Sequence, residues 1–185
     1  MALSEGNRRF AADRATHPRS SQSRIRETAQ GQHPCAIVLT CSDSRVPPEL
    51  VFDQGIGDLF VVRAAGNVAN NDEIGSIEFA VEHFSPALCI VLGHSRCGAV
   101  AAVVNGEPVS ETIARMVVPI AEAVAKVRPR TNRADLLAES IRANVRQSID
   151  DLQRGSALVA NSIRDAKLKL TGGIYKVEDG TVTWL

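Results

Sequence analysis

The sequence predicts a single α/β domain over residues 1–185, in which helices flank a central, mostly parallel β-sheet and the C-terminal part adds helices and a hairpin. Three observations predict this class: three short apolar runs without alternation, a helical apolar pattern between the second and third run, and a hydrophobic content of 44%. Strands of a parallel sheet are covered on both faces, so their sequences need not alternate. A chain of 185 residues with this composition can bury one substantial core.

The three apolar runs are predicted to be strands, and they cover residues 36–41, 59–63 and 87–94. Between the second and third run, apolar residues recur at helical spacing at Ile74, Ile77, Val81 and Phe84. A strand–helix–strand order is the repeating unit of a parallel sheet. We expect the next helix at residues 96–104, directly after the third strand.

The second half of the chain is predicted to be mainly helical. Residues 110–127 and 134–153 place apolar side chains at helical spacing, with charges on the opposite face. Pro129 separates these two helices, and Gly155 ends the second. The C-terminal residues are predicted to form a hairpin. Its two strands cover residues 173–177 and 181–185, and a tight turn at 178–180 joins them.

The charge and hydropathy patterns limit which classes of partner we expect and where in the cell we expect the protein. Lys and Arg total 21, as do Asp and Glu, and the densest basic stretch, residues 128–133, is short, so we expect no nucleic-acid partner. No apolar run reaches the roughly 18 residues of a membrane span, so we expect no membrane association. The first ten residues lack the apolar core of a signal peptide, which favours a cytoplasmic location; a periplasmic one stays open if a leader has been removed.

Two cysteines and one histidine stand where the predicted strands end. Cys41 is the last residue of the first run, and His94 and Cys97 flank the end of the third. Ligands of open parallel sheets bind beyond the carboxyl ends of the strands. Two thiolates and one imidazole leave a fourth position open on a zinc ion, which is typical of a catalytic site. Each residue taken singly is more often a packing residue, so the spacing alone leaves zinc binding and plain burial both open.

The other two cysteines are predicted to be packing residues. Cys35 and Cys89 lie at or within apolar runs, too far back along the strands to join the site at the strand ends. A thiol redox protein would place Cys-x-x-Cys at the start of a helix, but here the first position of that spacing is His94.

Asp43 and Arg45 follow Cys41 at alternate positions. A carboxylate two residues from a metal thiolate can coordinate the metal or hydrogen-bond its water, and an arginine beside it can hold it ionised through two parallel hydrogen bonds. The alternative is that this polar segment only forms a turn before Pro47. That alternative explains the polar residues but gives no reason for the arginine.

Four motifs follow one another along the sequence: CSDSR at 41–45, VPPELVFDQGIGDLFVVR at 46–63, GSIEFAVEHF at 75–84 and VLGHSRCGAV at 91–100. In these motifs and in their order, the chain resembles the β-class carbonic anhydrases. The resemblance runs from about residue 6 to the terminal hairpin. It implies one zinc ion per chain, held by Cys41, His94 and Cys97, and the reversible hydration of carbon dioxide to bicarbonate and a proton.

The same resemblance implies roles for residues around the metal. Asp43 and Arg45 become a catalytic pair, with Asp43 also a fourth zinc ligand in a closed form of the site. Gln32 becomes a substrate-binding residue supplied by the partner subunit, so the resemblance implies a homodimer or a dimer-based higher oligomer. The remaining substrate-cleft positions are Phe60, Ala65, Phe79 and Gly98. Core packing is the alternative role for the two phenylalanines.

The sequence departs from the pattern of one subgroup of the family, and it leaves the role of one histidine and two rival functions open. Val38 occupies the position at which the bicarbonate-inhibited subgroup carries a tryptophan, so we expect a non-allosteric enzyme. His83 lies one helical turn beyond Phe79 and is a candidate proton relay or a surface residue. The rival functions are a carbon disulfide or carbonyl sulfide hydrolase on the same scaffold, and a non-catalytic zinc-binding module.

Overall fold

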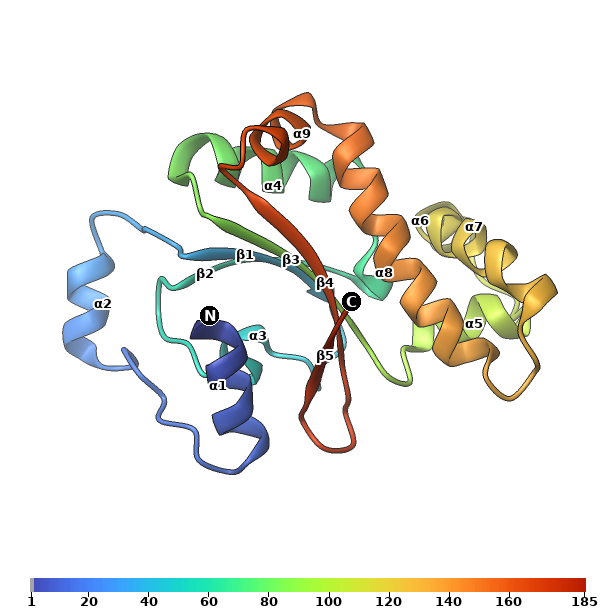
Figure 1. The fold of residues 1–185 in the computed structure, drawn as a ribbon, viewed down its shortest axis with the longest axis horizontal. Helices are drawn as coiled ribbons and strands as arrows, with labels where there is room; N and C mark the ends of the chain where they lie inside the picture. The colour runs from blue at the N-terminus through green and yellow to red at the C-terminus, as the bar shows by residue number, and fades with distance from the viewer. Residues whose placement is uncertain (1) are drawn as a thin grey trace.

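A five-stranded sheet forms the centre of the protein, in the order β2-β1-β3-β4-β5, in a computed structural model that describes residues 2–185 (Figure 1). The strands are β1 (Ala36–Cys41), β2 (Leu59–Ala64), β3 (Leu88–His94), β4 (Lys169–Tyr175) and β5 (Val182–Trp184). The first four are parallel, and β5 pairs antiparallel with β4. The predicted α/β class with a mostly parallel sheet is therefore confirmed.

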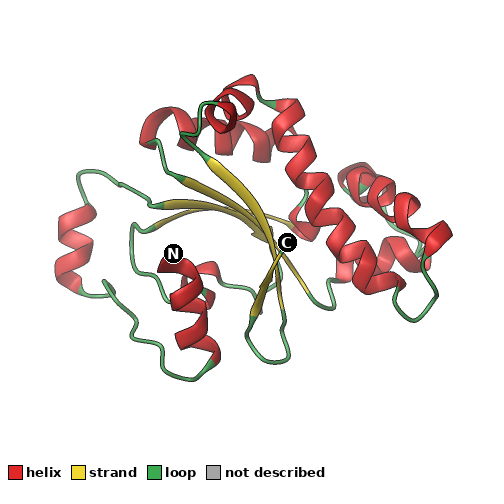
Figure 2. Ribbon diagram, in the orientation of Figure 1, coloured by secondary structure: helices red, strands yellow, loops and turns green. Residues whose placement is uncertain are grey.

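Helices cover both faces of this sheet (Figure 2). The helices of the described residues are α1 (Ala2–Ala11), α2 (Gln22–Thr28), α3 (Pro48–Val51), α4 (Asn71–Phe84), α5 (Gly98–Asn105), α6 (Glu111–Met116), α7 (Val118–Val127), α8 (Leu136–Gly155) and α9 (Ala157–Arg164). In Figure 1, α4, α8 and α9 lie on one side of the sheet, and α1 and α3 lie on the other.

Strand β1 shows why the apolar runs do not alternate, because all six of its residues are buried. Ile37 and Leu39 point to one face and join a core with α4, α8 and α9. Val38 points to the opposite face and joins a second core with α1 and α3. A third core lies beyond the carboxyl ends of the strands, where α5, α7 and α8 cover Cys41 and Cys97. This third core surrounds the predicted metal site.

The predicted strands and helices of the first half lie close to the observed ones. Strand β1 has the predicted bounds, β2 and β3 differ from prediction by one residue, and α5 begins two residues later than expected. Helix α4 begins before its first apolar residue, because Asn70 and Glu73 form a capping box that satisfies backbone N–H groups of the first turn.

The second half differs from the prediction at three places. The expected helix at 110–127 is two helices, because Pro119 cannot supply a backbone N–H and the chain breaks at Val117. The chain continues after Gly155 into α9, whose first turn is capped by the Ser156 hydroxyl accepting from the Val159 N–H at 3.1 Å. The first hairpin strand begins four residues earlier than expected and pairs parallel with β3.

The short helices α1, α2 and α3 were not expected from the sequence. Asn7 fixes α1 to the rest of the fold, since its side-chain amide donates to Val51 O at 3.1 Å and Gly180 O at 2.8 Å. The Asn7 Oδ1 atom accepts from the Val182 N–H at 2.9 Å. One buried side chain therefore joins the first helix to α3 and to the C-terminal hairpin.

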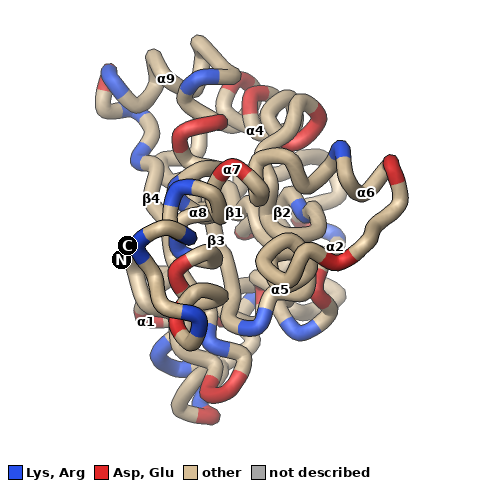
Figure 3. The backbone as a smooth tube through the Cα atoms, turned by 90° about the vertical axis from the view of Figure 1, so that its right-hand side faces the viewer, with Lys and Arg blue, Asp and Glu red and all other residues tan. Residues whose placement is uncertain are grey.

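Charged residues of both signs are interspersed along the chain (Figure 3). Several pair with each other, as Arg19 does with Asp58 at 2.6 Å and Arg9 with the buried Asp53 at 2.6 Å. Between residues 2 and 185, none of the helices is both long and apolar enough to cross a membrane.

Replacing Asn7 by Ala should lower the free energy of unfolding by about 2 kcal/mol, because it leaves the buried Val51 carbonyl and the partly buried Val182 N–H without their side-chain partner. Urea denaturation of the purified variant measures this change. Asn105→Ala is the control, because Asn105 is exposed and bonds only to nearby Glu107. An equally small effect of both substitutions would show that Asn7 does not fix α1 in place.

Candidate metal centre

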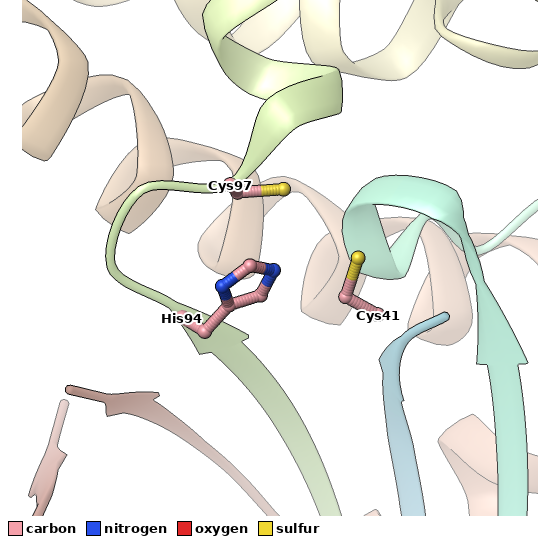
Figure 4. Close-up of side chains that lie close together, drawn as sticks. All are labelled: Cys41, His94 and Cys97. Carbon is pink, nitrogen blue, oxygen red and sulfur yellow. The ribbon is translucent and has the colours of Figure 1, made fainter. Parts of the chain in front are cut away.

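The ends of two neighbouring strands bring Cys41 and His94 together. Cys41 ends β1 and pairs with Ala64 of β2, while His94 ends β3 and pairs with Tyr175 of β4. Strand β1 is also in register with β3, through Thr40 and Leu92. Both side chains therefore leave the sheet at the same edge (Figure 4).

Cys97 reaches the same point from the start of α5, where it is the residue before the first helical turn. The chain turns sharply between His94 and Cys97, and Arg96 adopts a left-handed backbone conformation with φ of 55°. The ligand atoms of Cys41, His94 and Cys97 all lie within 4.8 Å of one another, and all three residues are buried (Figure 4).

The imidazole of His94 is arranged as a metal ligand. Its Nδ1 lies 2.8 Å from the Ser95 carbonyl oxygen, which can only accept, so we assign the proton to Nδ1. The other nitrogen, Nε2, is buried and has no hydrogen-bond partner among the described residues. A buried acceptor without a partner costs free energy, and a cation at this point removes that cost. Two thiols and one imidazole are a donor set that fits zinc.

The two thiols differ in how readily they lose a proton. A hydrogen bond from the Cys97 thiol lowers the pKa of Cys41, and hydrogen bonds from the Gly66 and Asp43 amides to its sulfur act in the same direction. The pKa of Cys97 is raised, first by this hydrogen bond to Cys41 and then by burial. One thiolate thus forms readily, and metal binding has to displace the proton of the second.

Asp43 and Arg45 form a bidentate ion pair beside the three ligand residues. Arg45 Nε donates to Asp43 Oδ1 at 2.9 Å, and Nη2 donates to Oδ2 at 2.7 Å. The Arg45 backbone N–H also donates to Oδ1, at 2.9 Å. The Arg45 guanidinium holds the pKa of the Asp43 carboxyl well below its usual range. Asp43 Oδ2 lies 3.8 Å from His94 Nε2, so the carboxylate faces the metal site while it stays paired with Arg45.

Two sets of contacts that hold the loops around the site, one after β1 and one after β3, were not predicted from the sequence. Arg63 donates to the Cys41 carbonyl at 3.1 Å and to the Asp43 carbonyl at 2.7 Å. The sequence signal that could have indicated this role of Arg63 was its charge within a predicted apolar strand. Glu178 accepts from the Ser95 hydroxyl at 2.7 Å and pairs with Arg96 at 2.6 Å. No sequence signal marks that contact, because 83 residues separate Ser95 from Glu178.

Two of the predicted cleft residues lie beside the metal site. Ala65 follows Ala64, the residue that pairs with Cys41, and it starts a short 3₁₀ turn over Ala65–Asn67. Gly98 follows Cys97 and is exposed; a Cβ atom added there would meet no atom within 4 Å. The space next to the cysteine is therefore open.

Gln32, Phe60 and Phe79 lie elsewhere in the same chain. Gln32 is exposed and precedes β1, so the length of the strand, about 17 Å, separates it from Cys41. Phe60 pairs with Ile37 near the other end of the sheet. Phe79 is 49% exposed on α4, and the Phe84 ring lies between it and Phe60, at 5.8 and 5.9 Å respectively. One chain does not bring these three residues to its own metal site.

Comparisons with known proteins agree on one family. A family model described as carbonic anhydrase matches residues 36–182. Among curated proteins, the carbonic anhydrase of Mycolicibacterium smegmatis is 38% identical over 183 residues, covering 98% of this chain and 89% of the relative. Carbonic anhydrase 2 of Mycobacterium tuberculosis is 37% identical over 183 residues, covering 97% of this chain and 87% of the relative.

Solved structures of the same class share the fold. The β-carbonic anhydrase CcaA matches with a TM-score of 0.80 and 28% identity, covering 97% of this chain and 91% of that chain. A Coccomyxa β-carbonic anhydrase, solved in complex with acetazolamide, matches with a TM-score of 0.80 and 25% identity. That match covers 98% of this chain and 83% of the Coccomyxa chain.

The Asp43–Arg45 pair predicts a pH-dependent stability. A carboxyl whose pKa is lower in the folded than in the unfolded state stabilises the fold above the unfolded pKa, about 3.9, and this contribution is lost as the pH falls. Metal-free Arg45→Gln should therefore be less stable than metal-free wild type from about pH 7 to about pH 5, with the difference shrinking below about pH 4.

Urea unfolding at a series of pH values measures this difference. Arg8→Gln is the matched control, because Arg8 pairs with Glu5 at the exposed surface and such pairs contribute little at any pH. A difference for Arg45→Gln that stays constant down to about pH 3 would contradict the role given to Arg45.

Proposed function

The chain belongs to the carbonic anhydrase family, in its β-class, and on this premise we propose that it is a zinc enzyme that interconverts carbon dioxide and bicarbonate at Cys41, His94 and Cys97. The observation that carries the proposal is the buried donor set, whose ligand atoms lie within 4.8 Å of one another. The Nε2 atom of His94 supports it, because it has no partner among residues 2–185 and its lone pair is available to a metal.

A zinc ion held by these three donors would supply the Lewis acidity that makes a water molecule a nucleophile near neutral pH. Asp43 stays ionised through Arg45, so its carboxylate can only accept a hydrogen bond. It faces the site and orients the attacking water by accepting its proton in a hydrogen bond. Arg45 keeps the carboxylate in place through two parallel bonds, which fixes its direction as well as its charge.

The substrate cleft is proposed to need a second chain. Ala65 and the open space at Gly98 belong to the cleft wall on the metal-binding chain. The partner chain would supply Gln32 to bind a substrate oxygen, and Phe60 and Phe79 to complete the apolar wall. The exposure of Phe79 supports this proposal, because a large apolar side chain on the surface is covered in a dimer. We therefore propose a homodimer with twofold symmetry, alone or within a larger oligomer.

The intact Asp43–Arg45 pair favours catalysis over a non-catalytic zinc module. A structural zinc site needs only its ligands, and it is usually closed by a fourth cysteine or histidine. Among residues 2–185, the group of candidate ligands consists of Cys41, His94 and Cys97 alone.

Purified wild-type protein should contain about one zinc per chain and should hydrate carbon dioxide in a stopped-flow assay. Cys41→Ser, His94→Gln and Cys97→Ser should each lose most of the zinc and the activity, because each removes one of three donors. Asp43→Asn should keep its zinc but lose hydration rate by roughly 100-fold, since it has the same shape without the charge.

Cys35→Ser is the control for these variants, because Cys35 is exposed, contrary to its predicted packing role, and lies at the opposite end of β1 from Cys41. It should keep both zinc and rate. Full activity in zinc-free wild-type protein, or in Cys41→Ser, would refute the proposed metal site.

Mixed dimers test whether the partner chain supplies Gln32. Gln32→Ala and His94→Gln homodimers should both have little activity. A heterodimer of the two chains combines the intact ligands of the first with the Gln32 of the second, so one of its two sites is intact. Co-expressed and doubly tagged heterodimers should therefore recover about half of the wild-type rate.

The reverse arrangement gives the opposite result. If Gln32 served the metal of its own chain, no site in the heterodimer would be intact and no rate would be recovered. Light scattering that reports a fully active monomer would also contradict the proposed dimer.

A further inference from the structure

The Cys41 sulfur accepts hydrogen bonds from two backbone amides. The Gly66 N–H lies 3.3 Å from Sγ, and the Asp43 N–H lies 3.4 Å from it. The Asp43 amide is two residues along the same loop, so local chain geometry places it. The Gly66 amide comes from the turn after β2 and needs some other support to stay on the sulfur.

The turn that carries this amide has an unusual backbone. Gly66 has φ of 74° and Asn67 has φ of 47°, so two successive residues are left-handed. A side chain at Gly66 would clash, because a Cβ atom there would lie 2.5 Å from Ile120 Cδ1 of α7. Glycine is the residue that adopts the widest range of backbone angles, so its own conformational preference does not fix the direction of the peptide groups.

Helix α8 supplies the support. Asn144 Nδ2 donates to the Gly66 carbonyl at 2.7 Å, and the Ser148 hydroxyl donates to the Asn67 carbonyl at 2.9 Å. Both side chains are fully buried, and they lie one helical turn apart on the same face of α8. They hold two successive carbonyls of a turn that is 78 residues away in the sequence.

We propose that Asn144 is a positioning residue of the metal centre, which acts through the Gly66 carbonyl to hold the Gly66 N–H on the Cys41 sulfur. Ser148 supports the same turn one residue later. A hydrogen bond to a thiolate stabilises its lone pairs, so less electron density reaches the bound metal. Asn144 thereby sets how strongly Cys41 donates to the metal without touching it, an inference that rests on the proposed zinc function.

Cobalt(II)-substituted protein gives a direct test, since its sulfur-to-metal charge-transfer band reports on the thiolate. In Asn144→Leu and Asn144→Asp, the band should move to lower energy than in wild type, because the sulfur loses its amide hydrogen bond. Zinc affinity, measured by competition with a chelator, should fall by about 10- to 100-fold, because the turn no longer holds the Cys41 sulfur in position and this loss outweighs the stronger donation.

Ser140→Ala is the matched control, because Ser140 is buried one turn earlier on α8 and its hydroxyl has no partner among the described residues. It should keep the wild-type band and affinity. A folded Asn144 variant with the wild-type band would overturn the inference, since Asn144 would then serve only to pack the helix.

A measurement on the wild-type protein makes the test independent of how the variants fold. With an NMR-active cadmium isotope in the site, the Gly66 amide proton should show a scalar coupling to the metal through the sulfur. A bound metal without this coupling would overturn the inference and leave the proposed function intact. Failure of wild-type protein to bind zinc, cobalt or cadmium would instead overturn the proposed function together with the inference.

Discussion

The parallel pairing of β1 with both β2 and β3 is the constraint on which the site depends. It aligns the carboxyl ends of three strands, so that Cys41 and His94 leave the sheet side by side and the turn after β2 reaches the same place. Because side chains alternate along a strand, a shift of the register by one residue would turn Cys41 to the opposite face. Burial of β1 on both faces makes such a shift costly, since Ile37 and Val38 lie in different cores.

The helices beyond the strand ends turn this alignment into a preformed site. They build a separate apolar core that buries Cys41 and Cys97, and His94 Nε2 beside them has no hydrogen-bond partner among the described residues. Backbone groups that the sheet does not pair are instead held by side chains, as Arg63 holds the loop after β1 and Asn144 holds the turn after β2. The ligands therefore need little rearrangement when a metal binds.

Local sequence patterns were sufficient to predict the features that depend on neighbouring residues in the chain. Strands β1 and β3 are apolar runs, and the candidate metal ligands and the Asp43–Arg45 pair lie in two short motifs. The assignment of these residues to zinc came from the family resemblance, because their spacing alone left plain burial open. Strand β4 begins at Lys169, four residues before its predicted start at Gly173, and the packing of α8 explains the glycine between these two starts, since a Cβ atom at Gly172 would lie 2.7 Å from Val145 Cγ1. The contacts of Asn144 depend on how α8 packs on the sheet, which no local pattern encodes. No local pattern indicates the proposed contribution of Gln32 by a partner chain, and only the family resemblance points to it.

The central claim is that the strand ends and the start of α5 hold zinc with two sulfurs and one imidazole. X-ray absorption at the zinc edge of the purified protein tests it most directly, because sulfur and lighter scatterers lie at different distances from the metal, about 2.3 and about 2.0 Å. The account predicts two sulfur neighbours per zinc, with imidazole scattering and one further light neighbour. A spectrum with four sulfurs, or with light atoms alone, would contradict it.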